Sequence, residues 1–410
     1  ITKDYFILKE IDFSIDDTLT PTKIEDSITR LQRLGIFSSV NIRTLEAKTM
    51  LSRRTVLISV ADRDPGIRNI GIGVTNERTT TFRGFAGIAY KNLFGKAHVA
   101  SARLDANYNT TELQFVEYKL SALYLYPYLL DSKVKLLTNF TQSRYISDFN
   151  NRLVTNTQQG SITFERDITT RIFVSYDLWT KALYQDYSIN PTNPYSNNLE
   201  IGSTSLSTQF DYRDHPFNPR RGFLARLSTE YGSPFFQSSR FITYSRNLAT
   251  LSAYLPLGER SSWANSIRGG HVKNLQSNLS DGTIAYTPYD KKGFILGGQT
   301  TIRGFTPAEA FPNSTDLGAV QYQLKTEASM FLFKSELRFP IWGDIGGAIF
   351  YDAGIVNIPG FNIPYRHSAG ISARFNTPVG PVSLEMGWKL NMQSSRNESL
   401  TALHLSIGAF

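Results

Sequence analysis

The sequence contains no cysteine, and it has little of what enzymes use. Without cysteine the 410 residues can form no disulfide bond, thiolate metal site or cysteine nucleophile, although an oxidising compartment such as the periplasm stays compatible. The five histidines show no metal-ligand spacing, and no nucleophile elbow, phosphate-binding glycine loop or zinc motif occurs. We therefore expect a protein that is not an enzyme and that uses no metal or cofactor.

Long apolar runs are missing as well. No window approaches the ~18 consecutive apolar residues of a transmembrane helix, and the richest short run, residues 123–130, is interrupted by Pro127. Yet 41% of the residues are hydrophobic, and they include 27 Phe and 21 Tyr. Two classes fit this composition: a large soluble all-β protein, or a membrane-spanning β-barrel, in which apolar and polar residues alternate.

Positive charge is in excess, with a formal net charge of +8. Lys and Arg are scattered over the sequence and form no basic stripe, which argues against a nucleic-acid partner. Anionic lipid headgroups match such a distribution better.

From about residue 69 onward, apolar and polar residues alternate with period two. In residues 116–124, Val116 and Leu120 fall on one face, and Glu117 and Lys119 fall on the other. Turn residues separate sixteen such runs, which leaves roughly 21 residues for each strand and its connection.

Alternation also occurs in soluble β-sandwiches. Here, however, Tyr, Phe and Trp gather near the ends of the runs, as in the aromatic girdles of membrane proteins, and the polar faces carry both signs of charge, as a polar lumen would. The sequence therefore predicts an all-β transmembrane barrel of 16 antiparallel strands over residues 66–410.

Residues 1–65 follow a different pattern. A helix is predicted to begin near Pro21, and the runs 36–42 and 55–60 are typical of paired strands. Together they predict a small α+β module, which is short for a domain that folds alone. We expect the module to be partial, with the first elements of its domain upstream of Ile1.

A nine-residue stretch, residues 297–305, combines flexible glycines with one arginine in the sequence Gly-Gly-Gln-Thr-Thr-Ile-Arg-Gly-Phe. Two acidic residues, Glu336 and Asp352, follow on two predicted neighbouring strands. Because a guanidinium group offers a planar fork of donors that a carboxylate accepts bidentately, Arg303 can fix this loop to the strands. The tripeptide Arg-Gly-Phe also occurs twice elsewhere, so the setting distinguishes this copy.

Five short motifs in this order resemble those of the BamA/TamA outer-membrane assembly superfamily, whose members carry periplasmic POTRA modules. They are Leu34–Val40, resembling a POTRA helix-to-strand junction, Asp211–Asp214 before Pro219, Gly297–Phe305, Phe350–Gly354, and Phe375–Pro381. The resemblance covers nearly the whole chain.

The resemblance implies a barrel in the outer membrane of a Gram-negative bacterium, with residues 1–65 in the periplasm as a POTRA-like module. A long loop at about 274–325 would fold back into the lumen, and its arginine would be tethered to acids on the wall. The residues implied in this tether are Arg303, Gly304, Phe305, Glu336, Asp352 and Phe350, with Phe305 near Phe350. Alternation supports the assignment, because it places Glu336 on one face with Lys334 and Arg338, and Asp352 on one face with Phe350.

The first and last strands are predicted to meet in a weak seam, because glycine packs nothing and weakens a strand. The seam residues are Ile70, Gly71, Ile72, Gly73 and Val74 on one side, and Leu403, Leu405, Ile407, Gly408 and Phe410 on the other. Strict alternation puts Phe410 opposite Leu403 and Leu405, so we expect a bulge at Gly408 if the last residue shares their face.

These observations lead to the hypothesis that the seam opens and that client strands add to its edges. Partners would be unfolded outer-membrane β-barrel proteins, outer-membrane lipid and lipopolysaccharide, and accessory proteins bound by the module. Two alternatives stay open: an exporter that passes a polypeptide through the lumen, as related two-partner-secretion transporters do, and a passive pore.

Overall fold

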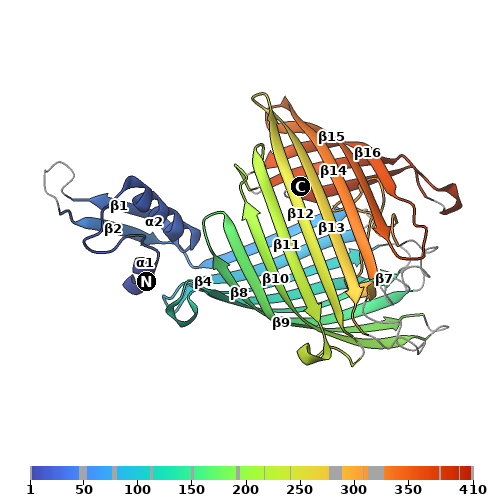
Figure 1. Cartoon of the computed structure of the whole chain (residues 1–410), viewed down its shortest axis with the longest axis horizontal. Helices are drawn as coiled ribbons and strands as arrows, with labels where there is room; N and C mark the ends of the chain where they lie inside the picture. Colours follow the sequence, from blue (N-terminus) through green and yellow to red (C-terminus); the bar gives the residue numbers. More distant parts are fainter. Residues whose placement is uncertain are drawn as a thin grey trace.

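The computed structural model describes residues 2–45, 53–75, 81–110, 114–148, 152–190, 194–216, 218–240, 242–276, 289–307, 309–312, 327–377, 380–396 and 398–407. Its main body is one sheet of 16 antiparallel strands that curves into a barrel, with each strand paired to its sequence neighbours (Figure 1). The predicted number and direction of the strands are confirmed. No helix in the described part of the chain is long and apolar enough to cross a membrane.

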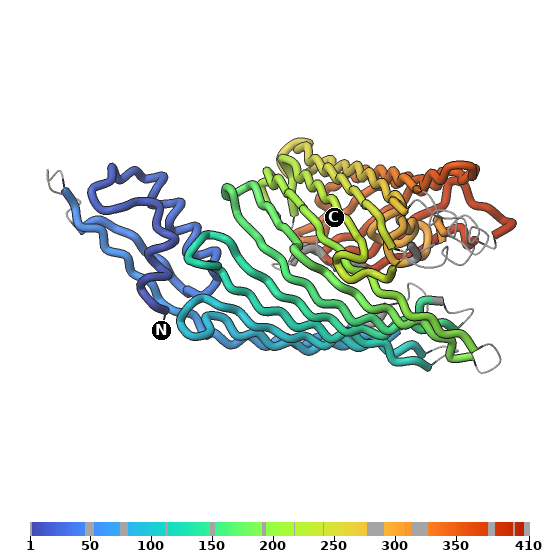
Figure 2. The backbone as a smooth tube through the Cα atoms, turned by 60° about the horizontal axis from the view of Figure 1, so that its bottom comes forward, coloured from blue at the N-terminus to red at the C-terminus, as the bar shows by residue number. Residues whose placement is uncertain are grey.

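The strands of the barrel are β3 (Gly66–Thr75), β4 (Thr81–Leu93), β5 (His98–Asn109), β6 (Val116–Tyr126), β7 (Lys135–Asp148), β8 (Leu153–Asp167), β9 (Ile172–Ser188), β10 (Ser196–Asp211), β11 (Gly222–Gly232), β12 (Tyr244–Leu257), β13 (Ser261–Asn274), β14 (Glu327–Trp342), β15 (Ile345–Asn357), β16 (Arg366–Thr377), β17 (Gly380–Lys389) and β18 (Thr401–Ile407). Strands β3 to about β10 form one wall of the barrel, and the following strands up to β18 form the opposite wall (Figure 2).

Burial along β14 is inverted relative to a soluble protein. Lys334, Glu336 and Arg338 are at most 8% exposed, whereas Phe331 and Leu337 are 50% and 40% exposed. Charged side chains thus fill the interior and apolar side chains face outward, as lipid requires.

The N-terminal module consists of α1 (Asp4–Lys9), α2 (Pro21–Arg33) and the antiparallel pair β1 (Phe37–Thr44) and β2 (Val56–Asp62). The side chain of Thr20 accepts a hydrogen bond from the backbone N–H of Lys23 at 3.3 Å, which caps α2 where the sequence predicts its start. Sequence analysis did not predict α1, because one and a half turns carry too little apolar periodicity.

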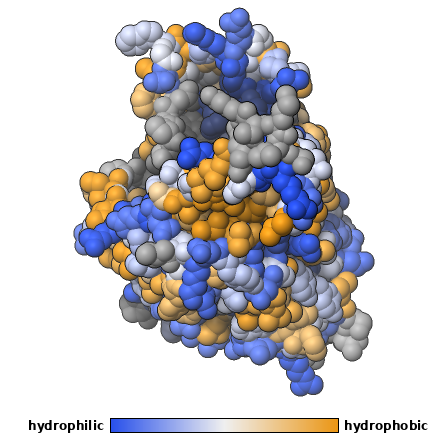
Figure 3. All heavy atoms as spheres, turned by 90° about the vertical axis from the view of Figure 1, so that its left-hand side faces the viewer, coloured by the Kyte–Doolittle hydropathy of each residue, from blue (hydrophilic) through white to orange (hydrophobic). Residues whose placement is uncertain are grey.

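The module packs against the connections at one end of the barrel. Ala97, from the β4–β5 turn, is buried in the core of the module, and the backbone N–H of Lys3 donates to the carbonyl of Gly95 at 3.0 Å. Lys9 forms an ion pair with Asp131 at 2.9 Å. Seen from the module end, hydrophobic residues are framed by hydrophilic ones (Figure 3).

The Lys9–Asp131 pair predicts how docking responds to pH. Hydrogen bonds from Lys9 and from Tyr5 hold the pKa of Asp131 below its usual value of 3.8. A depressed carboxyl pKa contributes stability that is present above the unfolded-state pKa and is lost as the pH falls through the folded-state pKa. We expect docking to weaken below about pH 4, and to do so less in Lys9→Met, as measured by hydrogen exchange in α1.

The matched control is Lys23→Met, which removes the partner of Asp17 inside the module and away from the docking contact. It is expected to leave the acid response of α1 unchanged. If the Lys9→Met variant shows the same acid response of α1 as the wild type, this ion pair does not contribute to docking.

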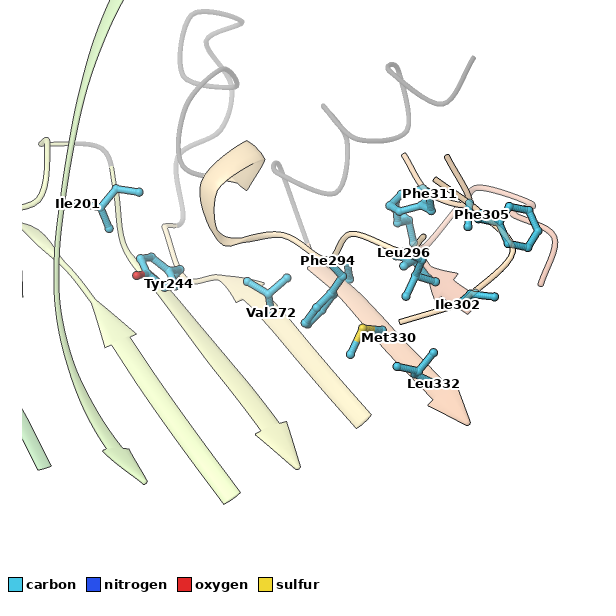
Figure 4. Packing of buried hydrophobic residues seen from close by; sticks show 14 of the residues in the cluster. Ile201, Tyr244, Val272, Phe294, Leu296, Ile302, Phe305, Phe311, Met330 and Leu332 are labelled. Atoms are coloured by element: carbon cyan, nitrogen blue, oxygen red, sulfur yellow. The ribbon is translucent and has the colours of Figure 1, made fainter. Parts of the chain in front are cut away.

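The segment between β13 and β14 lies in the barrel lumen where it is described. Phe294, Leu296, Ile302, Phe305 and Phe311 are each at most 3% exposed. Figure 4 shows these side chains against residues of the barrel wall. The wall residues of this cluster are Leu199, Ile201, Ile242, Tyr244, Val272, Ala328, Met330, Leu332, Val356 and Ile358. An apolar cluster inside an otherwise polar lumen fixes the position of the loop.

Candidate functional site

The loop motif is a compact hairpin held by its own backbone. Leu296 and Phe311 exchange two backbone hydrogen bonds, of 2.7 and 3.0 Å, and the N–H of Gly298 donates to the carbonyl of Phe305 at 2.8 Å. The hydroxyl of Thr301 donates to the carbonyl of Gly297 at 2.9 Å. These bonds present Arg303 at the tip of the hairpin.

Arg303 is 1% exposed and contacts three carboxylates. Its Nε and Nη2 donate to the two oxygens of Asp352 at 2.7 and 2.9 Å, and its backbone N–H donates to the same side chain at 3.0 Å. Its Nη1 donates to Glu336 at 2.5 Å and to Glu385 at 3.2 Å. The structure thus brings Arg303 together with both predicted acids and adds a third one.

Further charges surround these groups. Glu336 also accepts hydrogen bonds from Arg338, at 2.8 Å, and from Arg374, and Lys334 donates to the carbonyl of Gln299 at 3.1 Å. Four cations therefore face three carboxylates in what we call the Arg303 cluster: Arg303, Lys334, Glu336, Arg338, Asp352, Arg374 and Glu385. Buried charges in such numbers are stable only because nearly every one is paired.

The two aromatic residues of the predicted tether contact different cations. The guanidinium carbon of Arg303 lies 3.7 Å from the ring centroid of Phe350, so the arginine itself stacks on this ring. Phe305 instead contacts the cations Arg366 and Lys389, at 4.8 and 5.1 Å from its centroid. Sequence spacing does not tell which cation each ring contacts, because both rings belong to the same site.

Glycine allows the hairpin to approach the wall. Gly304 has φ +103°, and a Cβ on Gly387 of β17 would lie 2.6 Å from the nitrogen of Gly304. Any larger residue at either position would displace the loop. The N–H of Gly304 donates to Nε2 of His404 on β18 at 3.4 Å, and Ser368 donates to the carbonyl of Arg303.

The contacts of the hairpin therefore extend over five consecutive strands, β14 to β18. The last contact, at His404, lies on the strand that forms one edge of the sheet. A movement of the hairpin would thus directly change a contact of this edge strand.

A second buried ion pair lies beside Phe305. Arg366, at the start of β16, donates to both carboxylate oxygens of Glu398 in the β17–β18 connection, and the two side chains are 1% and 0% exposed. Lys389 donates to Glu309 of the loop at 2.5 Å. No motif of the sequence singles out these residues, and Glu398 lies in a connection without periodicity.

The predicted seam residues up to Ile407 lie on the two edge strands of the sheet, β3 and β18, whose described residues do not pair with each other. Ile70 and Ile72 are 83% and 94% exposed. A Cβ on Gly71 would lie 2.3 Å from the ring of Phe85, whereas one on Gly73 would meet nothing within 4 Å. A side chain at position 71 would therefore displace the ring of Phe85, whereas position 73 has space for one.

Leu403 and Leu405 on β18 are 57% and 46% exposed. Val74 and Ile407 belong to the edge strands, but their side chains lie outside the described residues, and so do Gly408 and Phe410 entirely. The predicted bulge at Gly408 stays a prediction. In the described part of the chain, no group of three or more acidic or histidine side chains could hold a metal ion.

A family model described as "Omp85 superfamily domain" matches residues 92–410. The chain belongs to the Omp85 superfamily. This confirms the resemblance inferred from the motifs, and it makes the chain an outer-membrane β-barrel without enzymatic activity. Membership also agrees with the charged interior and apolar exterior of β14.

One curated Omp85 relative is the outer membrane protein assembly factor BamA of Nitratidesulfovibrio vulgaris, 22% identical over 421 residues. The alignment covers all of this chain but about half of that relative, 50%. The relative is therefore about twice as long as the chain.

Solved structures show the same fold. BamA from Haemophilus ducreyi lacking POTRA domains 1–3 gives a TM-score of 0.70 at 17% identity, with 100% of this chain and 82% of that chain covered. CdiB from Escherichia coli gives 0.66 at 12% identity, covering 100% and 74%. CdiB from Acinetobacter baumannii gives 0.61 at 13% identity, covering 100% and 72%.

Proposed function

We propose that this chain is the barrel and adjoining module of an assembly factor that folds and inserts β-barrel clients into the outer membrane. The observation that carries the proposal is the pair of edge strands, β3 and β18, whose described residues leave their outer edges unpaired. An unpaired edge offers a row of N–H and C=O groups on which another strand can form. Unfolded outer-membrane proteins, which consist of such strands, are the clients that this edge fits.

The proposed role of the Arg303 cluster is to hold the hairpin and, through it, the strand β18. Support comes from the hydrogen bond between Gly304 and His404 and from the burial of Arg303. The hairpin also fills part of the lumen with apolar side chains, which favours lateral addition of strands over passage of a polypeptide along the barrel axis.

Residues 1–65 are proposed to act as a POTRA-like periplasmic module that receives clients or accessory proteins. Its docking onto the turns at one end of the barrel supports this placement. The apolar outer surface of the barrel would contact outer-membrane lipid and lipopolysaccharide.

Seam closure by a disulfide tests the proposal. The protein is placed in liposomes with one cysteine in 70–73 and one in 402–405, which is unambiguous because the native chain has no thiol. Folding of a denatured outer-membrane barrel client is then timed. Acceleration is expected in the reduced state, with at least roughly a tenfold loss on oxidation, since a closed seam exposes no edge.

The matched control pairs Leu384→Cys with Leu405→Cys, whose residues already face each other in the β17–β18 register. Oxidation of this pair closes no edge and is expected to leave client folding unchanged. Absence of acceleration in both states, together with ion conductance through the lumen, would instead favour the exporter or the passive pore.

A further inference from the structure

One cavity in the barrel lumen carries an excess of positive charge. Its volume is about 710 Å³, a size typical of small-ligand sites. Among the described residues, six cations line it but only two carboxylates, Glu336 and Glu385, and Arg303 already engages both. The cations are Arg226, Arg246, Arg268, Arg303, Lys334 and Arg374.

Two of these arginines lie in one cross-strand row. Arg226 on β11 faces Thr250 on β12, and Thr250 faces Arg268 on β13. With a strand spacing of about 4.8 Å, the two Cα atoms are roughly 10 Å apart. Two long side chains can converge from this distance on one small anion above Thr250. Ser228 and Ser266 line the cavity from the same strands as the arginines.

Arg226 has a neutral partner where a carboxylate would be expected. Its Nε and Nη2 donate to the amide oxygen of Gln209 at 3.1 and 2.6 Å. The carboxylate of Asp211, two residues further along β10, is occupied by a bidentate contact with Arg213. Arg226 and Arg268 are like charges in this row and repel each other, while Asp211 attracts Arg226 at longer range. An anion between them would relieve this repulsion.

Arg246 flanks the row on β12. Its guanidinium carbon lies 5.6 Å from the ring centroid of Phe294, and its Nε is buried and has no hydrogen-bond partner among the described residues. The carboxylate of Glu230 lies opposite it in the register but accepts from Lys292, Tyr244 and Ser203 instead.

Two lysines of the lumen differ in this respect. Lys291 pairs with Asp186 at 3.0 Å, and Lys389 pairs with Glu309 at 2.5 Å. Among the described residues, these three arginines form no ion pair with a carboxylate; Arg246 and Arg268 are partly buried and Arg226 is exposed to the lumen. Because charge that is withdrawn from water without a counter-charge is costly, this arrangement indicates a site whose counter-charge comes from a ligand.

We propose that this cavity binds a phosphate group, with Arg226 and Arg268 as its ligands and Arg246 as a flanking cation. Guanidinium forks and hydroxyl groups on three neighbouring strands match the several acceptor oxygens of a tetrahedral, multiply charged anion better than they match a carboxylate. The phosphate comes either from solution or from a lipid phosphomonoester.

Titration calorimetry with inorganic phosphate tests the site, using the full chain folded in phosphatidylcholine vesicles at constant ionic strength. Wild type is expected to bind phosphate saturably, and Arg226→Gln and Arg268→Gln are each expected to weaken binding roughly tenfold or more. Since either change removes one of two repelling charges, both variants are expected to fold. Hydrogen exchange of β11 and β13 in the wild type, with and without phosphate, gives a readout that needs no variant.

The matched control is Arg103→Gln. Arg103 also lies on a polar strand face, but it is outside the cavity and has its own carboxylate partner, Asp105, at 2.7 Å. This variant is expected to bind phosphate like the wild type. The proposal is overturned if wild type shows no saturable binding, if chloride at equal ionic strength has the same effect, or if both glutamine variants keep wild-type affinity.

The source of the phosphate is distinguished by adding phosphatidic acid to the vesicles in the absence of free phosphate. Protection of β11 and β13 that appears with phosphatidic acid, and that Arg268→Gln abolishes, assigns a lipid phosphate. Protection by free phosphate alone assigns a soluble anion. Both results support the site, whereas absence of protection in both arms contradicts it.

Discussion

Asparagine in place of Asp352 is expected to destabilise the protein by about 3–5 kcal/mol. Asp352 accepts three hydrogen bonds from Arg303, two of them from the guanidinium fork, and neither residue is more than 1% exposed. Loss of the carboxylate charge removes the bidentate partner of Arg303 and keeps its single contacts to Glu336 and Glu385. The free energy of unfolding in urea, followed by the shift between folded and unfolded bands on electrophoresis, measures the effect.

The charge reversal Asp352→Arg is expected to have the larger consequence, because it adds a fifth cation to the Arg303 cluster and leaves two carboxylates. Asp105→Asn is the matched control, since Asp105 pairs with Arg103 in a half-exposed setting where such pairs contribute about 1 kcal/mol or less. Wild-type folding and client assembly by Asp352→Arg would show that this contact does not hold the hairpin.

Alternation with period two made the barrel predictable, because lipid outside and charge inside impose opposite requirements on neighbouring residues. The same alternation, without any information on contacts, places Glu336 and Asp352 on lumen faces. It worked less well where periodicity is absent. The short helix α1 has only six residues, and the connection that contains Glu398 has no regular pattern.

Side-chain partners across the barrel were harder to predict than faces. Glu385 belongs to a strand whose alternation places it inside, but only the register of β16 and β17 brings it to Arg303. Sequence defines the face of each residue, whereas contact between strands distant in sequence depends on how the sheet closes and how the loop packs.

The Arg366–Glu398 pair carries the second large effect. Glu398→Ala is expected to lower the free energy of unfolding by about 3–5 kcal/mol, because it leaves Arg366 buried without its carboxylate. Since Glu398 lies in the connection that leads into β18, we also expect faster hydrogen exchange in β18 than in β14. Unfolding in urea and exchange followed by mass spectrometry measure the two effects.

A double variant tests whether β18 is held by the ion pair itself or by the packing of the two side chains. Arg366→Met combined with Glu398→Leu replaces both charges by apolar groups and is expected to recover most of the stability lost in Glu398→Ala, because no unpaired charge stays buried. The control Glu327→Gln removes one partner of an exposed pair with Lys273 and is expected to cost at most about 1 kcal/mol. If the double variant regains stability while exchange in β18 stays fast, the ion pair positions the edge strand. If both recover together, apolar packing alone is sufficient to hold β18, and the Arg303 cluster carries the connection between hairpin and seam.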